Sequence, residues 1–410
     1  MRIGIVTTWF ERGAAYVSKQ FKEVWEQSND VYIYARGGEF VAKSDANWNK
    51  GNITYGKRFN YSNLDLIDLE HFENWIKENE LDVVFFNEQH LWAPVLLCNK
   101  LKVKTGSYID YYTDETVLFF GVFDFLVCNT KRHRSVFHWH PNVFYIPWGT
   151  DVHVFNSSQR KIENPNYLTF FHSAGMNPYR KGTDSVVKAF KNIKDKSAKL
   201  VLHTQVNIFT FFPELKEAVQ SLFNENRLEI IEKTVSAPGL YYLGDVYVYP
   251  TRLEGIGLTI AEASACGMPV ITTNEPPMNE FVKEDINGKL IEVSAYKKRK
   301  DGYYWNESII DLSSLTGHLD FYCENINSIE KYKDQSYNYA KTYLNWDVNS
   351  KKLFEIIEHV TNLPLADKNV IIREIEEYER NRGWKFYIAN LKFYRIMKRK
   401  LFALYKQLVK

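Results

Sequence analysis

Residues 245–273 restrict the fold of this chain more than any other part of its sequence. Residues 245–250 are rich in Val and Tyr and predict a buried strand, and residues 268–273 predict the next strand. Residues 258–266 between them favour a helix, because Gly267 is well placed just beyond the end of that helix. Two strands that are joined through a helix run parallel, so this stretch predicts an α/β fold.

The loop before this helix suits the close approach of a ligand. Gly255 and Gly257 bring no side chains, so a ligand can reach the backbone. The amides that follow lie at a helix N-terminus, where free N–H groups and the helix dipole favour an anion. The predicted ligand-binding backbone is that of Gly255, Ile256, Gly257, Leu258 and Thr259.

Two glutamates stand on either side of these glycines, with seven residues between them. Glu254 ends the first strand, at the edge where α/β proteins bind ligands. Glu262 lies about one turn into the helix, where it can accept hydrogen bonds from hydroxyl groups. Either acid could instead cap a helix or face solvent, but the glycines favour a site for a diphosphate beside a polyhydroxylated group.

With these residues in place, residues 240–290 resemble the Glu-x7-Glu region of the retaining glycosyltransferases of the large group-1 family. Residues 240–251 are similar to that family's strand and loop, and residues 262–271 to its helix and next strand. Residues 279–282 and 287–290 fit two further landmarks of the family, in order and at the usual spacing.

Gly175 and Lys181 resemble the opening of the family's nucleotide-binding domain. The family usually carries an Arg directly after that Gly, and this chain has Met176 instead. Arg180 precedes Lys181, so it is the candidate for supplying the missing charge.

The resemblance implies an α/β fold of the GT-B type, in which two Rossmann-like doubly wound domains face each other across a cleft. It implies sugar transfer with retained anomeric configuration from a nucleotide-diphosphate sugar, UDP- or GDP-linked, with no metal or other cofactor required. By motif position, Glu262 holds the ribose hydroxyls, and Arg180 with the loop backbone binds the donor. Glu254, near the anomeric centre, and Lys181, which neutralises the diphosphate, are the predicted catalytic residues.

Strand-like and helix-like segments alternate from residue 1 to residue 146, and the alternation begins again at residue 168. Residues 146–151 between the two halves are similar to the family's inter-domain linker, with Trp148 where Asn is usual. We therefore expect an N-terminal Rossmann-like acceptor domain at 1–150, a Rossmann-like nucleotide-sugar donor domain at 151–345, and C-terminal helices at 346–410.

Polar residues also follow the predicted strands of the N-terminal domain. Gly13 follows the first strand in a predicted loop, where it can approach the donor phosphate. Glu88 and His90 directly follow a later predicted strand of this domain, and Asp110 directly follows the predicted strand after that one. All three can therefore face the acceptor. Many relatives carry a His that touches the donor sugar at the place of Asp110. A structural or solvated role is an equal alternative for each of these four residues.

The last residues of the chain are strongly basic. Residues 380–410 hold ten Lys and Arg and no acid, although the whole chain has a formal net charge of only +2. Tyr and Leu recur there at helical spacing, which predicts a basic amphipathic helix that contacts an anionic membrane surface. The alternative is a helix that packs on the acidic remainder of the chain or on a second subunit.

Composition limits the remaining classes of protein. The four cysteines show neither paired spacing nor a histidine pattern, so we expect reduced thiols and no metal site. Residues 1–10 fit a strand better than a secretory signal, and no segment approaches the ~20 apolar residues of a membrane span. We expect a cytoplasmic protein, peripheral on the inner face of the cell membrane, with no nucleic-acid partner.

Together these features predict a retaining glycosyltransferase. It would move a hexose-type sugar from a nucleotide-diphosphate sugar to a glycan, glycolipid or lipid-linked acceptor in bacterial surface polysaccharide synthesis. Two alternatives stay open. A GT-B nucleotide-sugar epimerase or a phosphorylase-like enzyme shares the fold, and a non-catalytic glycosyltransferase-like scaffold would account for Met176 and the missing histidine.

Overall fold

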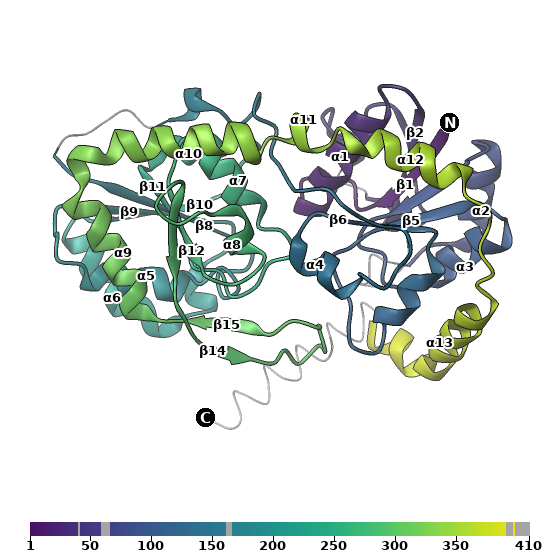
Figure 1. Ribbon diagram of the computed structural model, residues 1–410. Coiled ribbons are helices and arrows are strands. Elements are labelled where there is room, and N and C mark those ends of the chain that lie inside the picture. The colour runs from purple at the N-terminus through teal and green to yellow at the C-terminus, as the bar shows by residue number, and fades with distance from the viewer. Residues whose placement is uncertain (40–41, 59–65, 161–165, 391–396, 398–410) are drawn as a thin grey trace. The chain divides into compact units, whose positions relative to one another are not determined.

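The computed structural model describes residues 1–39, 42–58, 66–160, 166–390 and 397. The chain forms two compact units (Figure 1). The first unit comprises residues 1–128, 133–144 and 351–410, and the second comprises residues 129–132 and 145–350. Each unit is built on one twisted sheet with helices packed around it, which confirms the predicted α/β class with two doubly wound sheets.

The first unit contains a sheet of seven strands. They are β1 (Arg2–Thr7), β2 (Asp30–Ala35), β3 (Asn52–Tyr55), β4 (Val83–Phe86), β5 (Lys104–Tyr108), β6 (Phe125–Cys128) and β7 (Val143–Tyr145). Their order in the sheet is β3-β2-β1-β4-β5-β6-β7, and the neighbours from β3 to β6 pair in parallel. The strand order reverses between β1 and β4, which makes their carboxyl ends a switch point.

Helices and short 3₁₀ turns surround this sheet. They are α1 (Gly13–Trp25), η1 (Arg36–Gly38), η2 (Ala42–Ser44), α2 (Leu69–Glu78), α3 (Ala93–Lys100), η3 (Val117–Val122), α4 (Lys131–Val136), α12 (Lys352–Asn362) and α13 (Asn369–Asn390). The loop expected at Gly13 is wrong, because Gly13 is the first helical residue of α1 and Arg12 before it is extended. Phe21 of α1 then stacks on Phe85 of β4 in the aromatic core.

The helices at the C-terminal end of the sequence complete the first unit. Trp25 of α1 donates its indole N–H to the carbonyl of Leu353 in α12, at 3.4 Å. The ring of Phe119 meets Tyr378 of α13 edge to face, with 5.1 Å between the centroids. Segments from the two ends of the sequence therefore share one core.

A buried ion cluster holds the link between α12 and α13 against the sheet. Asp124 Oδ1 forms an ion pair with the ammonium of Lys368 at 2.9 Å, and the ammonium of Lys104 lies 3.9 Å from the same oxygen. The other Asp124 oxygen accepts the backbone N–H of Thr105 at 2.7 Å, and Lys104 donates to the carbonyl of Pro364 at 3.0 Å. We call Lys104, Asp124 and Lys368 the Asp124 cluster.

The second unit contains a six-stranded sheet. Its strands are β8 (Thr169–Gly175), β9 (Lys199–Thr204), β10 (Leu228–Glu232), β11 (Val246–Tyr249), β12 (Val270–Thr273) and β13 (Gly288–Ile291). They lie in the order β10-β9-β8-β11-β12-β13 and pair in parallel throughout. The order reverses between β8 and β11, so this sheet repeats the switch point of the first.

The helices and 3₁₀ turns of the second unit connect these strands and follow them. They are η4 (Ser157–Gln159), α5 (Thr183–Asn192), η5 (Ile208–Thr210), η6 (Pro213–Leu215), α6 (Lys216–Asn224), η7 (Tyr241–Leu243), α7 (Leu258–Ala265), α8 (Met278–Phe281), α9 (Leu312–Glu324), η8 (Ile326–Ser328), α10 (Ile329–Tyr343) and α11 (Trp346–Asn349). The predicted strand, loop, helix and strand at 245–273 are confirmed as β11, α7 and β12. Phe170, Val248 and Ile271 lie in the core between sheet and helices.

A hairpin that the sequence pattern did not predict follows β13. Its strands are β14 (Val293–Lys297) and β15 (Glu307–Ile310), and they pair antiparallel with each other only. Figure 1 shows the hairpin extending away from the six-stranded sheet.

The predicted basic helix at 380–410 lies mostly outside the described residues. Helix α13 includes its beginning, from Arg380 to Asn390. Within the described parts of the chain, the helices are all too short or too polar to cross a membrane.

Candidate functional site

Two loops meet at the switch point of the second sheet. One follows β8 and leads to Lys181, and the other follows β11 and leads to Glu254. The carbonyl of Arg180 in the first loop accepts the backbone N–H of Arg252 at 2.8 Å and the hydroxyl of Thr251 at 2.9 Å. These bonds fix the two loops against each other at the edge where doubly wound sheets bind ligands.

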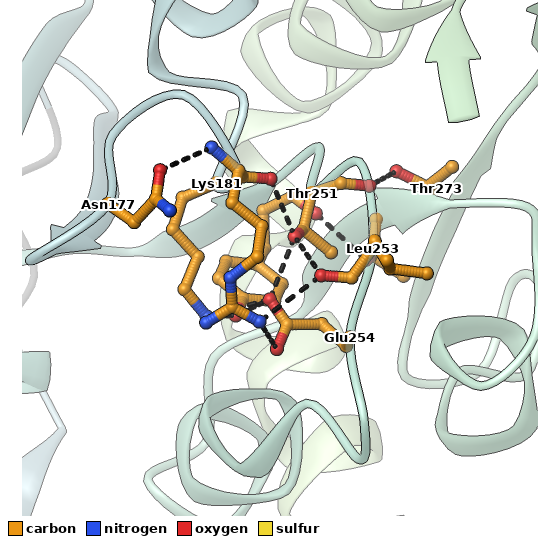
Figure 2. A network of polar contacts seen from close by, with 9 residues as sticks. Asn177, Lys181, Thr251, Leu253, Glu254 and Thr273 are labelled. Carbon is orange, nitrogen blue, oxygen red and sulfur yellow. Dashed lines mark hydrogen bonds and ion pairs between the residues drawn. The ribbon is translucent and has the colours of Figure 1, made fainter. Parts of the chain in front are cut away.

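Three charged side chains from these loops form one cluster (Figure 2). Glu254 accepts the ammonium of Lys181 on Oε1 at 2.7 Å and the guanidinium of Arg180 on Oε2 at 2.8 Å. The Glu254 side chain is 6% exposed and that of Lys181 15%, whereas that of Arg180 is 34% exposed. We call Arg180, Lys181 and Glu254 the Glu254 cluster, and it opens to solvent on its Arg180 side.

The charges in this cluster shift each other's pKa. Burial raises the pKa of a carboxyl group, but the charges of Arg180 and Lys181 outweigh it and bring the pKa of Glu254 to about 2. Burial and the Arg180 charge lower the pKa of Lys181 to about 8, against the attraction of Glu254. The negative charge of Glu254 also raises the pKa of Arg180. At neutral pH two cations therefore share one carboxylate, and the surplus positive charge suits an anionic ligand.

The glycines of the second loop behave as their positions predict. Gly257 caps α7 with a φ of 89°, a left-handed conformation that favours glycine, and no side chain caps that helix. A Cβ added at Gly255 would meet no other atom within 4 Å, so there is open space beside this backbone. The start of α7, with Ile256, Leu258 and Thr259, thus offers a helix N-terminus within a few residues of Glu254.

Glu262 lies on the same helix, one turn further on. Its carboxylate accepts the phenol of Tyr241 at 2.6 Å. Burial raises the pKa of Glu262, while the Tyr241 hydrogen bond and the Lys181 charge act in the opposite direction. The charge of Lys181 thus interacts with both glutamates, so the structure brings Glu254, Lys181 and Glu262 into one neighbourhood.

The unusual residue of the first loop, Met176, lies at the surface. Met176 is 71% exposed, and it follows Gly175, whose φ is 56°. Arg180, four residues further on, places its guanidinium on Glu254.

The candidate residues of the N-terminal half lie together in the first unit. His90 Nε2 is 3.3 Å from Asp110 Oδ2, so the ends of β4 and β5 meet there. Glu88 has a φ of 53° and its carboxylate lies 3.7 Å from the guanidinium of Arg12. Burial and the charge of Asp110 raise the pKa of Glu88. Gly13 begins α1 beyond β1, the neighbour of β4.

Residues that the sequence pattern did not single out surround the Glu254 cluster. Tyr179 donates its phenol to Glu307 of the hairpin at 3.0 Å and accepts Lys297 at 3.2 Å. The backbone N–H of Ser308 donates to the carbonyl of Arg252 at 2.8 Å. The hairpin therefore holds both site loops, and only its tertiary contacts reveal this, because its own sequence is a run of charged and aromatic residues.

A metal site in a protein usually consists of three or more His, Cys, Asp or Glu side chains around one point. Over the described residues, no such group is present.

Comparison with known proteins shows a family match over the region that contains these loops. Residues 155–302 match the family described as glycosyl transferases group 1. The mannosyltransferase LpsB of lipopolysaccharide core biosynthesis from Rhizobium meliloti is 38% identical over 72 residues, which are 18% of this chain and 20% of that protein. An uncharacterized glycosyltransferase from Methanocaldococcus jannaschii is 26% identical over 176 residues, 39% of this chain and 41% of its own. The matches thus span well under half of these relatives.

Solved structures resemble the whole described fold. A glycosyltransferase from Rickettsia africae has a TM-score of 0.70 and 16% identity, over 88% of this chain and 99% of its own. HepE from Anabaena, solved in complex with UDP and glucose, has a TM-score of 0.66 and 14% identity, over 88% and 100%. At such identities the likeness concerns the fold alone, which is GT-B.

The matched region, residues 155–302, contains both site loops, the Glu254 cluster and α7. The paired glutamates and their glycine loop, inferred above from sequence, thus lie inside the family region and at a switch point of the fold. Residues 155–302 thus match the group-1 family of glycosyltransferases, and a mannosyltransferase is among the similar proteins.

Proposed function

We propose that this protein is a retaining glycosyltransferase whose donor is a nucleotide-diphosphate sugar. The observation that carries the proposal is the Glu254 cluster, in which two cations share one buried carboxylate beside a glycine-flanked helix N-terminus. A diphosphate is doubly anionic and suits the surplus positive charge and the amides at the start of α7. The complexes of HepE with UDP and glucose support a uridine donor for that fold relative.

In the proposed mechanism each group of the second unit has one task. Arg180 and Lys181 bind the diphosphate and stabilise the charge that grows on it as the glycosidic bond breaks. Glu254 is ionised at neutral pH, since its pKa is about 2, so it accepts a hydrogen bond from the donor sugar and does not supply a proton. Glu262 accepts hydrogen bonds from the ribose hydroxyls.

The acceptor hydroxyl then attacks from the face on which the nucleotide leaves, which preserves the anomeric configuration. Rate enhancement would come from positioning and from electrostatic stabilisation of the leaving group. Glu88, His90 and Asp110 of the first unit are the proposed acceptor-side groups, and Gly13 the proposed donor-phosphate contact of that unit.

The proposed acceptor is a glycan, glycolipid or lipid-linked sugar of a bacterial surface polysaccharide. The name of LpsB, a lipopolysaccharide core mannosyltransferase, supports this class for the relative. A membrane contact through residues 380–410 stays a prediction, with the tail's charge as its support. Binding to anionic vesicles that survives deletion of 380–410 would contradict it.

A thermal-shift screen of UDP- and GDP-sugars tests the donor. A donor at 100 times its dissociation constant should stabilise the protein by about 2.7 kcal/mol. The shift should disappear in Lys181→Gln and persist in Lys188→Gln, a surface lysine of α5 that is 47% exposed. No shift with any nucleotide sugar would remove the basis of the proposal.

Glu254→Ala separates an enzyme from a scaffold. Turnover of the donor that the screen identifies should fall on the order of 100-fold or more, while the circular dichroism spectrum stays the same. A scaffold would show no turnover to lose. Release of an epimerised nucleotide sugar in the absence of acceptor would favour the epimerase. An anomeric proton coupling in the product that reports the opposite configuration to the donor would rule out retention.

A further inference from the structure

Two neighbouring tyrosines of β11 make different use of their hydroxyl groups. Tyr247 and Tyr249 are two residues apart, so they face the same side of the sheet, and both have no exposed surface. Their rings stack with centroids 5.4 Å apart and planes at 20°. The Tyr249 hydroxyl donates to Glu254 Oε1 at 2.8 Å and accepts the ammonium of Lys181. Among the described residues, the Tyr247 hydroxyl makes no hydrogen bond to the Glu254 cluster, and the side chain that acts on it is Thr259.

The Tyr249 hydrogen bond is one of three on a single carboxylate oxygen. Glu254 Oε1 accepts Lys181 at 2.7 Å, Tyr249 at 2.8 Å and Thr251 at 2.8 Å. A carboxylate oxygen has about two lone-pair directions, so three donors occupy Oε1 fully. The other oxygen, Oε2, accepts Arg180, the most exposed member of the cluster. A ligand that approaches from solvent therefore finds Oε2.

The chemical state of Tyr249 limits what it can do. Burial and the Glu254 charge hold the pKa of Tyr249 well above its usual value, so the phenol keeps its proton. It can then only donate to the carboxylate and accept from the ammonium, which also lies 4.8 Å from the centre of its ring. Tyr249 joins the negative and positive members of the cluster through one buried oxygen atom.

We propose that Tyr249 is a positioning residue for sugar transfer. Its hydroxyl holds Glu254 and Lys181 in a fixed relation, so that Oε2 of Glu254 is the oxygen presented to the donor sugar and the ammonium stays beside the diphosphate. The inference rests on the proposed function, because it gives Glu254 and Lys181 the roles stated there. Tyr249 itself touches neither donor nor acceptor.

Tyr249→Phe tests the proposal, since it removes one oxygen atom and keeps the ring, its stacking and its contact with Lys181. We expect kcat to fall about tenfold or more, the usual effect of losing a hydrogen bond to a charged group, and the donor KM to change less than about twofold. An equal rise in KM with unchanged kcat would instead assign Tyr249 to donor binding and overturn the positioning role.

The pH profile of this variant supplies a readout that a packing role would not move. Without the phenol donor the pKa of Glu254 rises, and without the phenol acceptor the pKa of Lys181 falls below about 8. The pH range of activity should therefore narrow on both sides, by about one pH unit on the alkaline side. A profile identical to that of the wild type overturns the proposal.

Tyr247→Phe is the matched control, because Tyr247 lies on the same strand and is equally buried but has no hydrogen bond to the Glu254 cluster among the described residues. Activity and pH profile should stay unchanged, and stability should stay equal or rise. If both variants lose activity equally, the two rings act only through packing and the positioning role is wrong.

Competitive acetylation of Lys181 with acetic anhydride, read by mass spectrometry across pH, measures the lysine pKa without any substrate. We expect a midpoint near the wild-type value of about 8 in Tyr247→Phe and a lower one in Tyr249→Phe. A lower midpoint in a protein that transfers no sugar supports the hydroxyl link and refutes the proposed function. An unchanged midpoint in an active enzyme refutes the link alone.

Discussion

The Asp124 cluster of the first unit and the Glu254 cluster of the second each place a buried carboxylate between two cations, and they lie at opposite edges of their sheets. The Asp124 cluster stands where β5 and β6 begin, at the amino ends of the strands. The Glu254 cluster stands where β8 and β11 end, at the carboxyl ends. Ligands of doubly wound folds bind at the carboxyl edge, so equal sets of charge can differ in role through their place alone.

Exposure and hydrogen bonding separate the clusters further. The three side chains of the Asp124 cluster are 5% to 10% exposed, and its hydrogen bonds join the sheet to the link before α13. In the Glu254 cluster Arg180 is 34% exposed, so one side stays accessible. A closed cluster contributes to stability, and an open one at a switch point can exchange its counter-ion for a ligand.

Asp124→Asn should have the largest effect on stability. It leaves two buried lysines without their shared charge, and breaking a buried ion pair costs about 3–5 kcal/mol. Urea denaturation followed by tryptophan fluorescence measures the loss. Turnover per folded molecule should match the wild type, the reverse of Glu254→Ala. Reduced turnover in the folded fraction of Asp124→Asn would mean that the Asp124 cluster also serves the reaction.

The pH dependence should distinguish the Glu254 cluster on its alkaline side. Lys181 has a pKa of about 8 in the folded protein, so activity that needs its charge should fall about tenfold per pH unit above pH 8. Lys181→Arg should extend activity to higher pH, because a guanidinium keeps its proton.

The stability of the second unit should change in the opposite direction to the activity over the same alkaline pH range. The folded protein gives up the Lys181 proton before the unfolded chain does, so the stability of the second unit should rise between pH 8 and 10.5. On the acid side, Glu254 contributes stability that is complete above pH 4.5 and lost as the pH falls toward 2. An activity profile flat to pH 10 would show that the Lys181 charge is not needed.

The smallest effect should come from Met176, in contrast to Arg180 in the same loop. Met176→Arg places a charge on an exposed side chain and should change donor affinity less than about twofold. Arg180→Gln should weaken donor binding by about tenfold or more, because it removes a charge-assisted hydrogen bond. Isothermal titration with the donor measures both. A large gain in Met176→Arg would show that Arg180 replaces the usual arginine incompletely.

The second-unit site was accessible from sequence because its parts are close along the chain. Residues 245–273 contain the strand, the glycine loop and both glutamates, so periodicity and turn chemistry were enough to predict that local structure. The contact between Glu254 and Lys181 spans 73 residues, and only the family resemblance placed them at one donor. The hydrogen bond of Tyr249 was missed because a buried tyrosine in a strand reads as core.

The Asp124 cluster could not be predicted in the same way. Asp124 and Lys368 lie far apart in the sequence, and isolated charges in a pattern indicate solvent rather than core. The hairpin of β14 and β15 was missed for a related reason, since its charged and aromatic run shows no alternation. Gly13 was placed in a loop from the outline resemblance of the N-terminal third to the family, yet it is the first helical residue of α1.

The first unit takes its sheet from the start of the sequence and its last helices from beyond residue 350. A ribosome therefore finishes every strand of the second unit before it releases the helices that cover α1. Until then Trp25 lacks the carbonyl of Leu353 and Asp124 lacks Lys368. The first sheet of the nascent chain is therefore not yet covered by its last helices. The unit whose sheet is synthesised first is therefore completed last. Chaperones that shield nascent chains should stay bound to it longer than to the second unit.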